Sequence, residues 1–340
     1  MSQLLKTSGD LENTYIDERV SFLLPQFEAL APYKITQRKK GVPSEDLMGW
    51  ERLAALEAKN LKVTYPDDRP EDEKTYGTCL RQITALKKHL RLAAKTKLQD
   101  AALYHPVLTI ITHFGEALSY QFSSYKERQN TDYRHRVRER STIENRIELD
   151  LSQFIQRAYE VLSQIASGDN DVDWRDVSCA IALATGRRMS EVHLSATFKE
   201  IDAYTVGFSG QLKGKTRTVD GKKLKNFEFE IPTLLPAYLV CFGLEWLDKR
   251  DKRFPRTEDT ERVNRRWSKV LNQKAKDWEI IPEMTYHKFR GAYFRASLVN
   301  AGVDPFDYVD FARRVLGDDD ESTIKAYQRF KIALNSLTKI

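Results

Sequence analysis

The spacing of hydrophobic and polar residues along the chain predicts a protein that is built mainly of helices. Apolar residues recur at three- and four-residue intervals, as on one face of a helix. Ser141 and Glu144 have the spacing of a capping box, and Asp304-Pro305 suits a helix start. The predicted helices span 15–31, 45–60, 75–97, 100–122, 142–167, 174–185, 234–248, 260–278, 285–299, 305–316 and 320–334.

Two short segments in the second half show the two-residue period of a β-strand instead. Hydrophobic residues alternate with small or polar ones over 204–209, and with glutamates over 227–231. The residues between these segments are rich in lysine and contain Gly214 and Gly221. We therefore expect a β-hairpin with a long basic tip, and a fold class of mainly α with a small antiparallel sheet (α+β).

A polar stretch near the middle of the chain predicts a domain junction. Residues 123–142 (SSYKERQNTDYRHRVRERST) are highly charged and contain few aliphatic side chains. We interpret 1–122 as a helical N-terminal domain, 123–142 as a charged linker, helical or extended, and 143–340 as a second domain.

Composition narrows the class of protein. The chain has 340 residues, of which 41% are hydrophobic and 31% charged, as expected for globular domains with a core. It contains neither an apolar run of the roughly 18 residues that a membrane span needs nor a secretory pattern at its start. The cysteines and histidines lack metal-site spacing. We expect an intracellular protein without a membrane segment or a bound metal.

The net charge of +6 is unevenly distributed. Basic residues gather over 34–40, 213–225 and 249–256, with two arginines just beyond the last group. Such clusters can neutralise the phosphates of a nucleic acid, although each can equally be a solvated loop or helix face. The candidate DNA contacts are Arg38, Lys39, Lys40, Lys215, Arg217, Lys222, Lys223, Lys225, Arg265 and Arg266.

Four short motifs follow one another in the second half of the chain. TGRRMSEV carries Arg188, FSGQLKGK carries Lys213, HKFR carries His287 and Arg290, and LGDDDESTIKAY ends in Tyr327. Each residue alone has an ordinary interpretation, such as a core tyrosine or a solvated lysine. Their order on suitable elements is what indicates a catalytic set.

This set resembles the catalytic domain of the tyrosine recombinases, in which Arg, Lys, His-x-x-Arg, His or Trp, and Tyr occur in this order. TGRRMSEV is similar to the family's TGxRxSEL box, HKFR to its HxxR box, and LGDDDESTIKAY to its LGHxxxxTTxxY box. The resemblance covers residues 174–331. Within this superfamily, the run 208–213 and the doubled arginine are most similar to the telomere resolvases, or protelomerases.

The resemblance implies a role for each motif residue. Tyr327 is the nucleophile that forms a 3′-phosphotyrosyl bond. Arg188 and Arg290 bind the non-bridging phosphate oxygens and stabilise the charge that develops there. Lys213, with neighbouring Lys215 as the alternative, protonates the leaving 5′-oxygen. His287 binds a phosphate oxygen or helps to deprotonate the tyrosine, and the reaction needs no cofactor, neither metal nor ATP.

Asp318 departs from the family pattern. It lies nine residues before Tyr327, where the family has a histidine. Its carboxylate can accept the tyrosine's proton or orient a neighbour, or Gly317-Asp318 can close one helix and cap the next. Both interpretations remain open at this point.

The implied function is that of a telomere resolvase. Such an enzyme cleaves both strands of a palindromic replicated telomere site and seals each end as a hairpin. We expect a homodimer on double-stranded DNA in the bacterial cytoplasm or nucleoid, encoded by a phage or plasmid. The alternatives are an integrase that exchanges strands between duplexes and a catalytically inactive DNA-binding relative.

Overall fold

The computed structural model describes residues 8–31, 49–66, 73–212, 216–219, 222–225, 228–281, 283–304, 307–318 and 321–333. The chain divides into two compact units, Met1–Tyr133 and Arg134–Ile340. The division falls inside helix α5 (Ser123–Ser141), so the charged segment is helical. Within the described ranges, no helix is long and apolar enough to cross a membrane.

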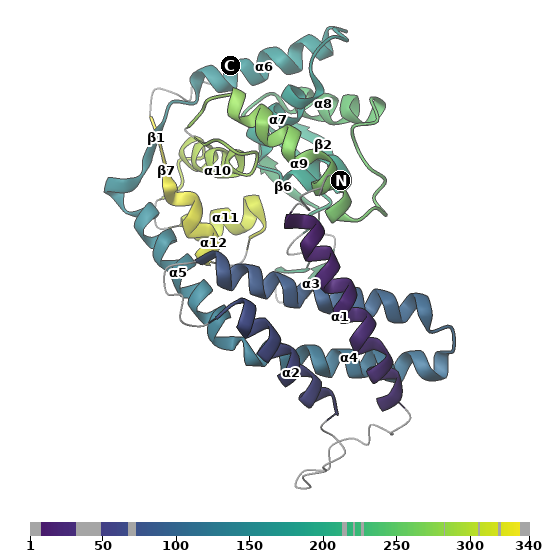
Figure 1. Ribbon diagram of the computed structural model, residues 1–340. Coiled ribbons are helices and arrows are strands. Elements are labelled where there is room, and N and C mark those ends of the chain that lie inside the picture. Colours follow the sequence, from purple (N-terminus) through teal and green to yellow (C-terminus); the bar gives the residue numbers. More distant parts are fainter. Residues whose placement is uncertain are drawn as a thin grey trace, which may run out of the picture. The chain divides into compact units, whose positions relative to one another are not determined.

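The N-terminal unit is built from helices (Figure 1). They are α1 (Ser8–Leu30), α2 (Gly49–Thr64), α3 (Glu73–Lys97), α4 (Ala101–Gln121) and the first part of α5. Helix α2 packs on α4, and α3 packs on both α1 and α4. Phe27 and Phe114 meet in the core with ring centroids 5.1 Å apart. The four helices predicted before residue 123 are confirmed, although α1 begins earlier than expected.

The C-terminal unit is organised around one central helix, α7 (Trp174–Thr185), which is buried beyond its first turn. It packs against α6 (Ser152–Ala166), α8 (Ala237–Lys249), α9 (Thr260–Asp277) and α10 (Lys288–Asn300) (Figure 1). Every residue from Val177 to Thr185 is buried. The small side chains of this helix, alanines above all, let neighbouring helices approach closely. The predicted helix over 174–185 is confirmed at both ends.

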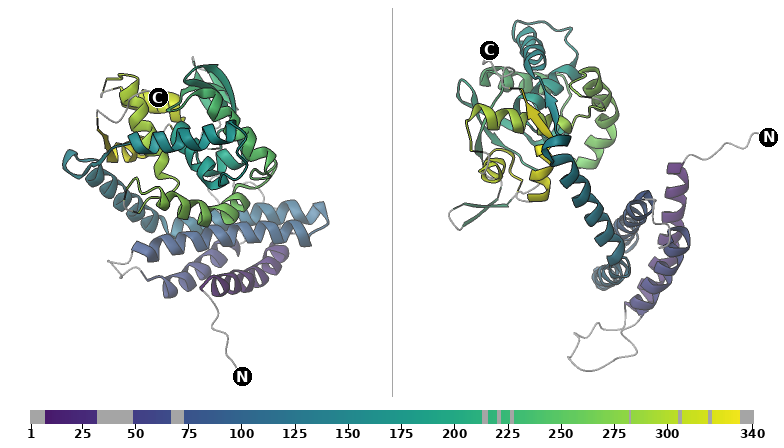
Figure 2. Two further views of the ribbon diagram at one scale, coloured as in Figure 1. Left: turned by 90° about the horizontal axis from the view of Figure 1, so that it is seen from above. Right: turned by 90° about the vertical axis from the view of Figure 1, so that its left-hand side faces the viewer.

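A three-stranded antiparallel sheet lies beside these helices (Figure 2), in the order β2 (Thr197–Asp202), β3 (Thr205–Ser209), β6 (Phe229–Pro232). Strands β4 (Thr216–Val219) and β5 (Lys222–Lys225) form a second hairpin between β3 and β6. The predicted hairpin is confirmed. Strand β2 was not predicted, because its side chains are mostly exposed and show no apolar alternation.

The predicted helix over 142–167 is wrong at its start. Helix α5 ends at Ser141, whose hydroxyl donates to the Arg138 carbonyl instead of capping a new helix. A 3-10 turn (Ile143–Asn145) and strand β1 (Ile147–Leu149) follow before α6 begins. The capping-box spacing therefore falls on the end of one helix, where hydrogen bonding within the last turn takes precedence.

The predicted helix over 320–334 is also wrong beyond its first turns. Helix α12 (Glu321–Ala326) passes into a 3-10 turn (Tyr327–Arg329) and then strand β7 (Phe330–Ile332). Strand β7 pairs in parallel with β1, opposite Ile147–Leu149 (Figure 1). Pairing with a strand far away in the sequence overrides the local helical pattern. The preceding helix, α11, spans Tyr308–Leu316, so it starts later than the predicted Pro305, which lies outside the described residues.

Gly186, which ends α7, is predicted to be needed for folding. Its φ is +67°, and an added Cβ would lie 2.2 Å from the ring of Tyr293. That ring is buried and its hydroxyl donates to the Pro232 carbonyl. Gly186→Ala is therefore expected to destabilise the protein by about 2–5 kcal/mol, measured by urea unfolding, from left-handed strain and overpacking together.

Gly302→Ala is the matched control for this prediction. Gly302 has a similar φ of +60° but nothing within 4 Å of an added Cβ. Gly302→Ala should lower the free energy of unfolding only by the cost of the left-handed backbone conformation, about 1–2 kcal/mol. Equal losses for the two variants would contradict the packing argument.

Candidate active site

Four of the predicted site residues meet at one point of the C-terminal unit. Asp318 Oδ2 accepts from Arg290 Nη2 at 2.8 Å and from the Tyr327 hydroxyl at 2.9 Å. Asp318 Oδ1 accepts from Arg188 Nη2 at 2.5 Å. The Tyr327 hydroxyl in turn accepts from Arg290 Nε at 3.0 Å. A tyrosine, two guanidiniums and a carboxylate thus form one continuous network.

The ends of two helices provide the frame of this network. Helices α7 and α11 both finish at a glycine in the left-handed conformation, Gly186 and Gly317. The last carbonyls of a helix lack partners within it and carry partial negative charge. Arg290 donates to two of them, Gly186 O at 2.7 Å and Leu316 O at 2.8 Å. The guanidinium therefore neutralises both helix ends while it faces Tyr327.

Arg187 repeats this arrangement one residue earlier. Its guanidinium is buried, donates to Thr185 O at 3.1 Å and Val315 O at 2.7 Å, and lies 4.4 Å from the Phe208 ring centroid. Burial and the nearby Arg290 charge lower the pKa of Arg187 to about 10. Sequence analysis assigned this residue no role. The doubled arginine of TGRRM was its only signal, and the structure shows a link between the ends of α7 and α11.

Glu191 is a second residue that sequence analysis missed. It is fully buried and accepts from the Arg188 backbone N–H and from Arg188 Nη1, both at 3.0 Å. Burial opposes its ionisation, but Arg187, Arg290 and Arg188 together hold the pKa of this carboxyl below its ordinary value. Its position in TGRRMSEV, three residues after Arg188, was the available signal. Glu191 fixes the direction in which the Arg188 guanidinium points.

The surroundings of Tyr327 keep its hydroxyl protonated in the absence of DNA. The side chain is only 5% exposed, in the 3-10 turn that follows α12. Burial and the Asp318 carboxylate raise the pKa of Tyr327, although Arg290 opposes the shift. Burial also acts to raise the pKa of Asp318, but Arg290 and Arg188 outweigh it and hold that pKa well below its usual range. The proton therefore stays on the tyrosine.

The structure describes the other predicted site residues in less detail than the four in the network. His287 is exposed at the N-cap position of α10, three residues before Arg290. Arg265 and Arg266 are exposed on α9, and Arg266 lies 4.9 Å from the Trp267 ring centroid. Arg217, Lys222, Lys223 and Lys225 lie on β4 and β5, where only the backbone is described. Lys213, Lys215, Arg38, Lys39 and Lys40 fall outside the described residues.

A buried polar chain lies under the turn that carries Glu191. His193 is fully buried, and its Nδ1 lies 2.7 Å from the Lys252 carbonyl, so this nitrogen carries the proton. Its Nε2 accepts from the Ser178 hydroxyl at 2.7 Å, and the Tyr286 hydroxyl lies 2.9 Å from the same oxygen. This chain joins the Glu191 turn to the residues that precede α10. It is enclosed, so it serves structure and not chemistry.

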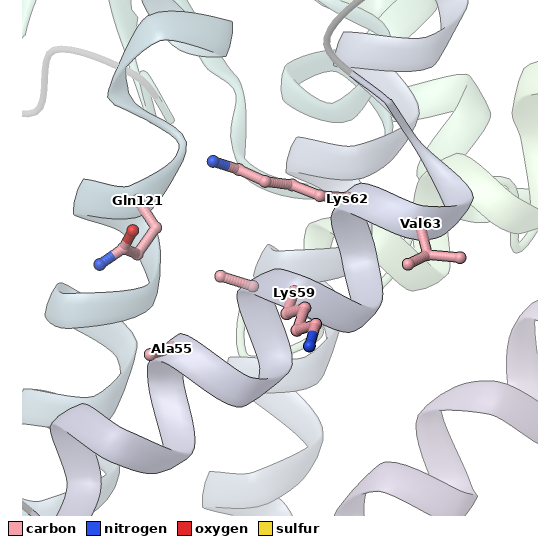
Figure 3. A pocket seen from close by; sticks show the side chains of 6 residues that line it. Ala55, Lys59, Lys62, Val63 and Gln121 are labelled. Carbon is pink, nitrogen blue, oxygen red and sulfur yellow. The ribbon is translucent and has the colours of Figure 1, made fainter.

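The N-terminal unit has a shallow groove between α2 and α4. Its volume is about 370 Å³, and Lys59, Lys62 and Gln121 contribute polar atoms (Figure 3). Lys62 extends toward α4, with its amine 5.8 Å from the Phe122 ring centroid (Figure 3). The lining residues include two lysines and no carboxylate. The groove therefore offers positive charge.

Comparison with known sequences gives one family and several relatives. Residues 145–330 match the family described as telomere resolvase ResT/TelK catalytic domain. The protelomerase of Escherichia phage N15 is 27% identical over 208 residues, covering 57% of this chain and 33% of the phage protein. The protelomerase of Yersinia phage PY54 is 26% identical over 205 residues, covering 55% and 32%. The chain thus spans about one third of the length of the curated relatives it matches.

Solved structures of similar fold extend the likeness to nearly the whole chain. Protelomerase TelA covalently complexed with substrate DNA has a TM-score of 0.61 at 17% identity, and 94% of each chain is covered. An arginine-to-alanine variant of TelA with a DNA hairpin product has a TM-score of 0.63 at 16% identity, covering 95% of each. At these identities the comparison shows the fold, and it confirms the predicted mainly helical class with small sheets.

The His193 chain predicts a pH dependence of stability. Burial, with a smaller contribution from Arg253, lowers the pKa of His193 from 6.5 to about 4. Between these values the unfolded chain binds a proton that the folded protein excludes. Because of this residue, the free energy of unfolding is highest above pH 6.5 and decreases as the pH falls toward 4, by up to about 3 kcal/mol. His193→Gln should lose this part of the pH dependence.

Urea unfolding at pH 7.5 and pH 4.5 tests this prediction. The stability gap between wild type and His193→Gln should narrow at the lower pH by about 3 kcal/mol at most. His135→Gln, which changes an exposed histidine on α5, is the matched control and should behave like wild type. A gap that is constant with pH would show that His193 is not held neutral.

Proposed function

Because the chain belongs to the telomere resolvase family, we propose that it is a DNA strand transferase that forms hairpin ends through a 3′-phosphotyrosyl intermediate. The observation that carries the proposal is the Tyr327 hydroxyl, 3.0 Å from Arg290 Nε and joined through Asp318 to Arg188. A nucleophile and two guanidiniums in one network are what attack on a phosphodiester requires. The curated relatives with this catalytic domain are named protelomerases.

The proposed reaction has two similar steps. In the first, the Tyr327 oxygen bonds to phosphorus, the bond to the 5′-oxygen breaks, and Lys213 protonates that leaving oxygen. Arg188 and Arg290 stabilise the negative charge that grows on the non-bridging oxygens. In the second, a 5′-hydroxyl attacks the phosphotyrosine and releases Tyr327. The covalent intermediate conserves the bond, so strands can be rejoined in a new pairing.

Hairpin formation requires two active sites on one palindrome. A homodimer matches the symmetry of such a site and puts one Tyr327 on each strand. Each freed 5′-hydroxyl then folds back onto the phosphotyrosine of the opposite strand. We propose that the exposed Arg265 and Arg266, the basic β4–β5 hairpin, Arg38–Lys40 and the Lys59/Lys62 groove contact backbone phosphates.

The product on a linear palindromic duplex tests the function. The target is first selected by binding from a library of random inverted repeats. Hairpin products should run under denaturing conditions as single strands of double length. Tyr327→Phe, which removes only the hydroxyl, should bind the duplex but give no product. Recombinant duplexes that need two sites would favour an integrase instead, and no product with a bound duplex would indicate an inactive relative.

A 5′-bridging phosphorothiolate tests the general acid. Sulfur leaves without a proton, so this substrate should restore cleavage by Lys213→Ala to within about tenfold of wild type, against a loss of about 10²–10⁴ on ordinary DNA. Arg290→Ala should not be restored, because its role is charge stabilisation. Lys215→Ala is the matched neighbour: if the sulfur substrate restores cleavage in this variant alone, the acid is Lys215.

A further inference from the structure

The carboxylate of Asp318 occupies the place where the proposed function puts a phosphate. Its two oxygens divide between the guanidiniums: Oδ1 binds Arg188 at 2.5 Å, and Oδ2 binds Arg290 Nη2 at 2.8 Å. Oδ2 also accepts from the Tyr327 hydroxyl at 2.9 Å. One anion therefore already bridges both arginines beside the nucleophile. The side chain is 8% exposed and thus largely enclosed in the network.

Arg290 has no second face to offer a phosphate. Its Nη1 donates to Gly186 O, and one of its Nη2 bonds goes to Leu316 O. The edge formed by Nε and Nη2, which suits two-point binding of an oxyanion, faces Asp318 Oδ2. A phosphate that binds this edge must displace the carboxylate. Arg188, by contrast, has guanidinium N–H groups with no partner among the described residues and is 13% exposed.

The charges of the site lead to the same conclusion. Among the described residues, Arg187, Arg188 and Arg290 are accompanied by two carboxylates, Glu191 and Asp318, so this described cluster retains one positive charge. A phosphodiester that approaches with Asp318 in place meets a carboxylate at short range. If Asp318 is displaced and then protonated, the three guanidiniums and Glu191 leave two positive charges. In the proposed reaction these two charges, with that of the Lys213 general acid, face the doubly negative pentacoordinate transition state.

We infer that Asp318 is an internal anion that stands in for the scissile phosphate when DNA is absent and, once displaced, accepts the proton of Tyr327. The inference rests on the proposed function and concerns its first step. The O–H bond of Tyr327 breaks and its proton passes to the Asp318 carboxylate. The tyrosine oxygen bonds to phosphorus, and the departing 5′-oxygen takes its proton from the general acid.

The arrangement makes the nucleophile depend on its substrate. While Arg188 and Arg290 hold Asp318, the pKa of this carboxyl stays low, and it is a poor acceptor for the neighbouring Tyr327 proton. A phosphate that takes over both guanidiniums removes this stabilisation, so the carboxyl becomes more basic beside the tyrosine. Arg188, Arg290 and Tyr327 are the groups that face it. The histidine of the family motif can donate to a phosphate at this position, whereas an ionised aspartate competes with it.

Anion binding without DNA tests the first part of the inference. The probe is sodium sulfate at constant ionic strength, and the measurement is the thermal unfolding midpoint of the full chain. Asp318→Asn keeps the size of the side chain and removes its charge, so its apparent Kd for sulfate should be at least about tenfold lower than that of wild type. Equal affinities, or no binding by either protein, would overturn the inference.

Two controls tie the effect to this site. Asp310→Asn makes the same change at an exposed position of α11, where Asp310 pairs with Arg313, and should bind sulfate like wild type. Adding Arg188→Ala to Asp318→Asn should abolish the gain in affinity; a gain that persists would place the sulfate elsewhere and contradict us. If Asp318→Asn does not fold, Asp318→His, which restores the motif residue, is measured in its place with the same expectation.

Single-turnover cleavage of a nicked suicide duplex tests the second part. Asp318→Asn should bind the duplex at least as tightly as wild type, because the site is free of its own anion, yet form the covalent adduct about 100-fold more slowly. A rate within threefold of wild type would disprove the role as proton acceptor. If wild type itself forms no adduct, the proposed function fails, whereas the sulfate measurement still decides whether the carboxylate excludes an anion.

Discussion

The C-terminal unit depends on the hydrogen bonds that the buried guanidinium of Arg290 makes. It binds the carbonyl of Gly186, which caps α7, the last carbonyl of α11, the Asp318 carboxylate and the Tyr327 hydroxyl. The last three partners lie within 316–327, whereas Gly186 is 104 residues away from Arg290 in the sequence. A single planar group with five donors in a fixed geometry can hold all of them, which a lysine could not do. The same contacts that assemble the fold therefore direct Arg290 toward the Tyr327 hydroxyl.

Burying so much charge is stable because carboxylates and helix-end carbonyls surround the guanidiniums. Arg187, Arg290 and Glu191 are almost completely excluded from solvent. Moving an ion out of water costs several kcal/mol of solvation free energy, which neighbouring opposite charges and hydrogen bonds must offset. The converging helix ends supply carbonyls for the arginines, and Glu191 and Asp318 supply carboxylates. Replacing any one of them leaves an uncompensated charge, so the site is sensitive to substitution throughout.

Tyr327, the proposed nucleophile, is placed by its neighbours more than by its own helix. Tyr327 lies where α12 passes into a 3-10 turn, and β7 begins three residues later. The pairing of β7 with β1 fixes this turn from one side, and Arg290 with Asp318 fixes it from the other. The phenol is consequently held in position before DNA binds. In the proposed reaction the substrate changes the charge around the phenol, and Asp318 is the group that responds.

The sequence by itself determined the elements and residues whose signals are local. The helix over 174–185 followed from its periodicity and its terminal glycine, and the motif order identified Arg188, Arg290 and Tyr327 as one set. Only the tertiary structure decided that β7 pairs with β1, that Arg187 joins two helix ends, and that Asp318 binds both arginines. Asp318 and Arg188 are 130 residues apart, and Arg187 and Val315 are 128 apart. Contacts at such separations arise from burial and from the demand of enclosed polar groups for partners, and neither is encoded in the pattern of neighbouring residues.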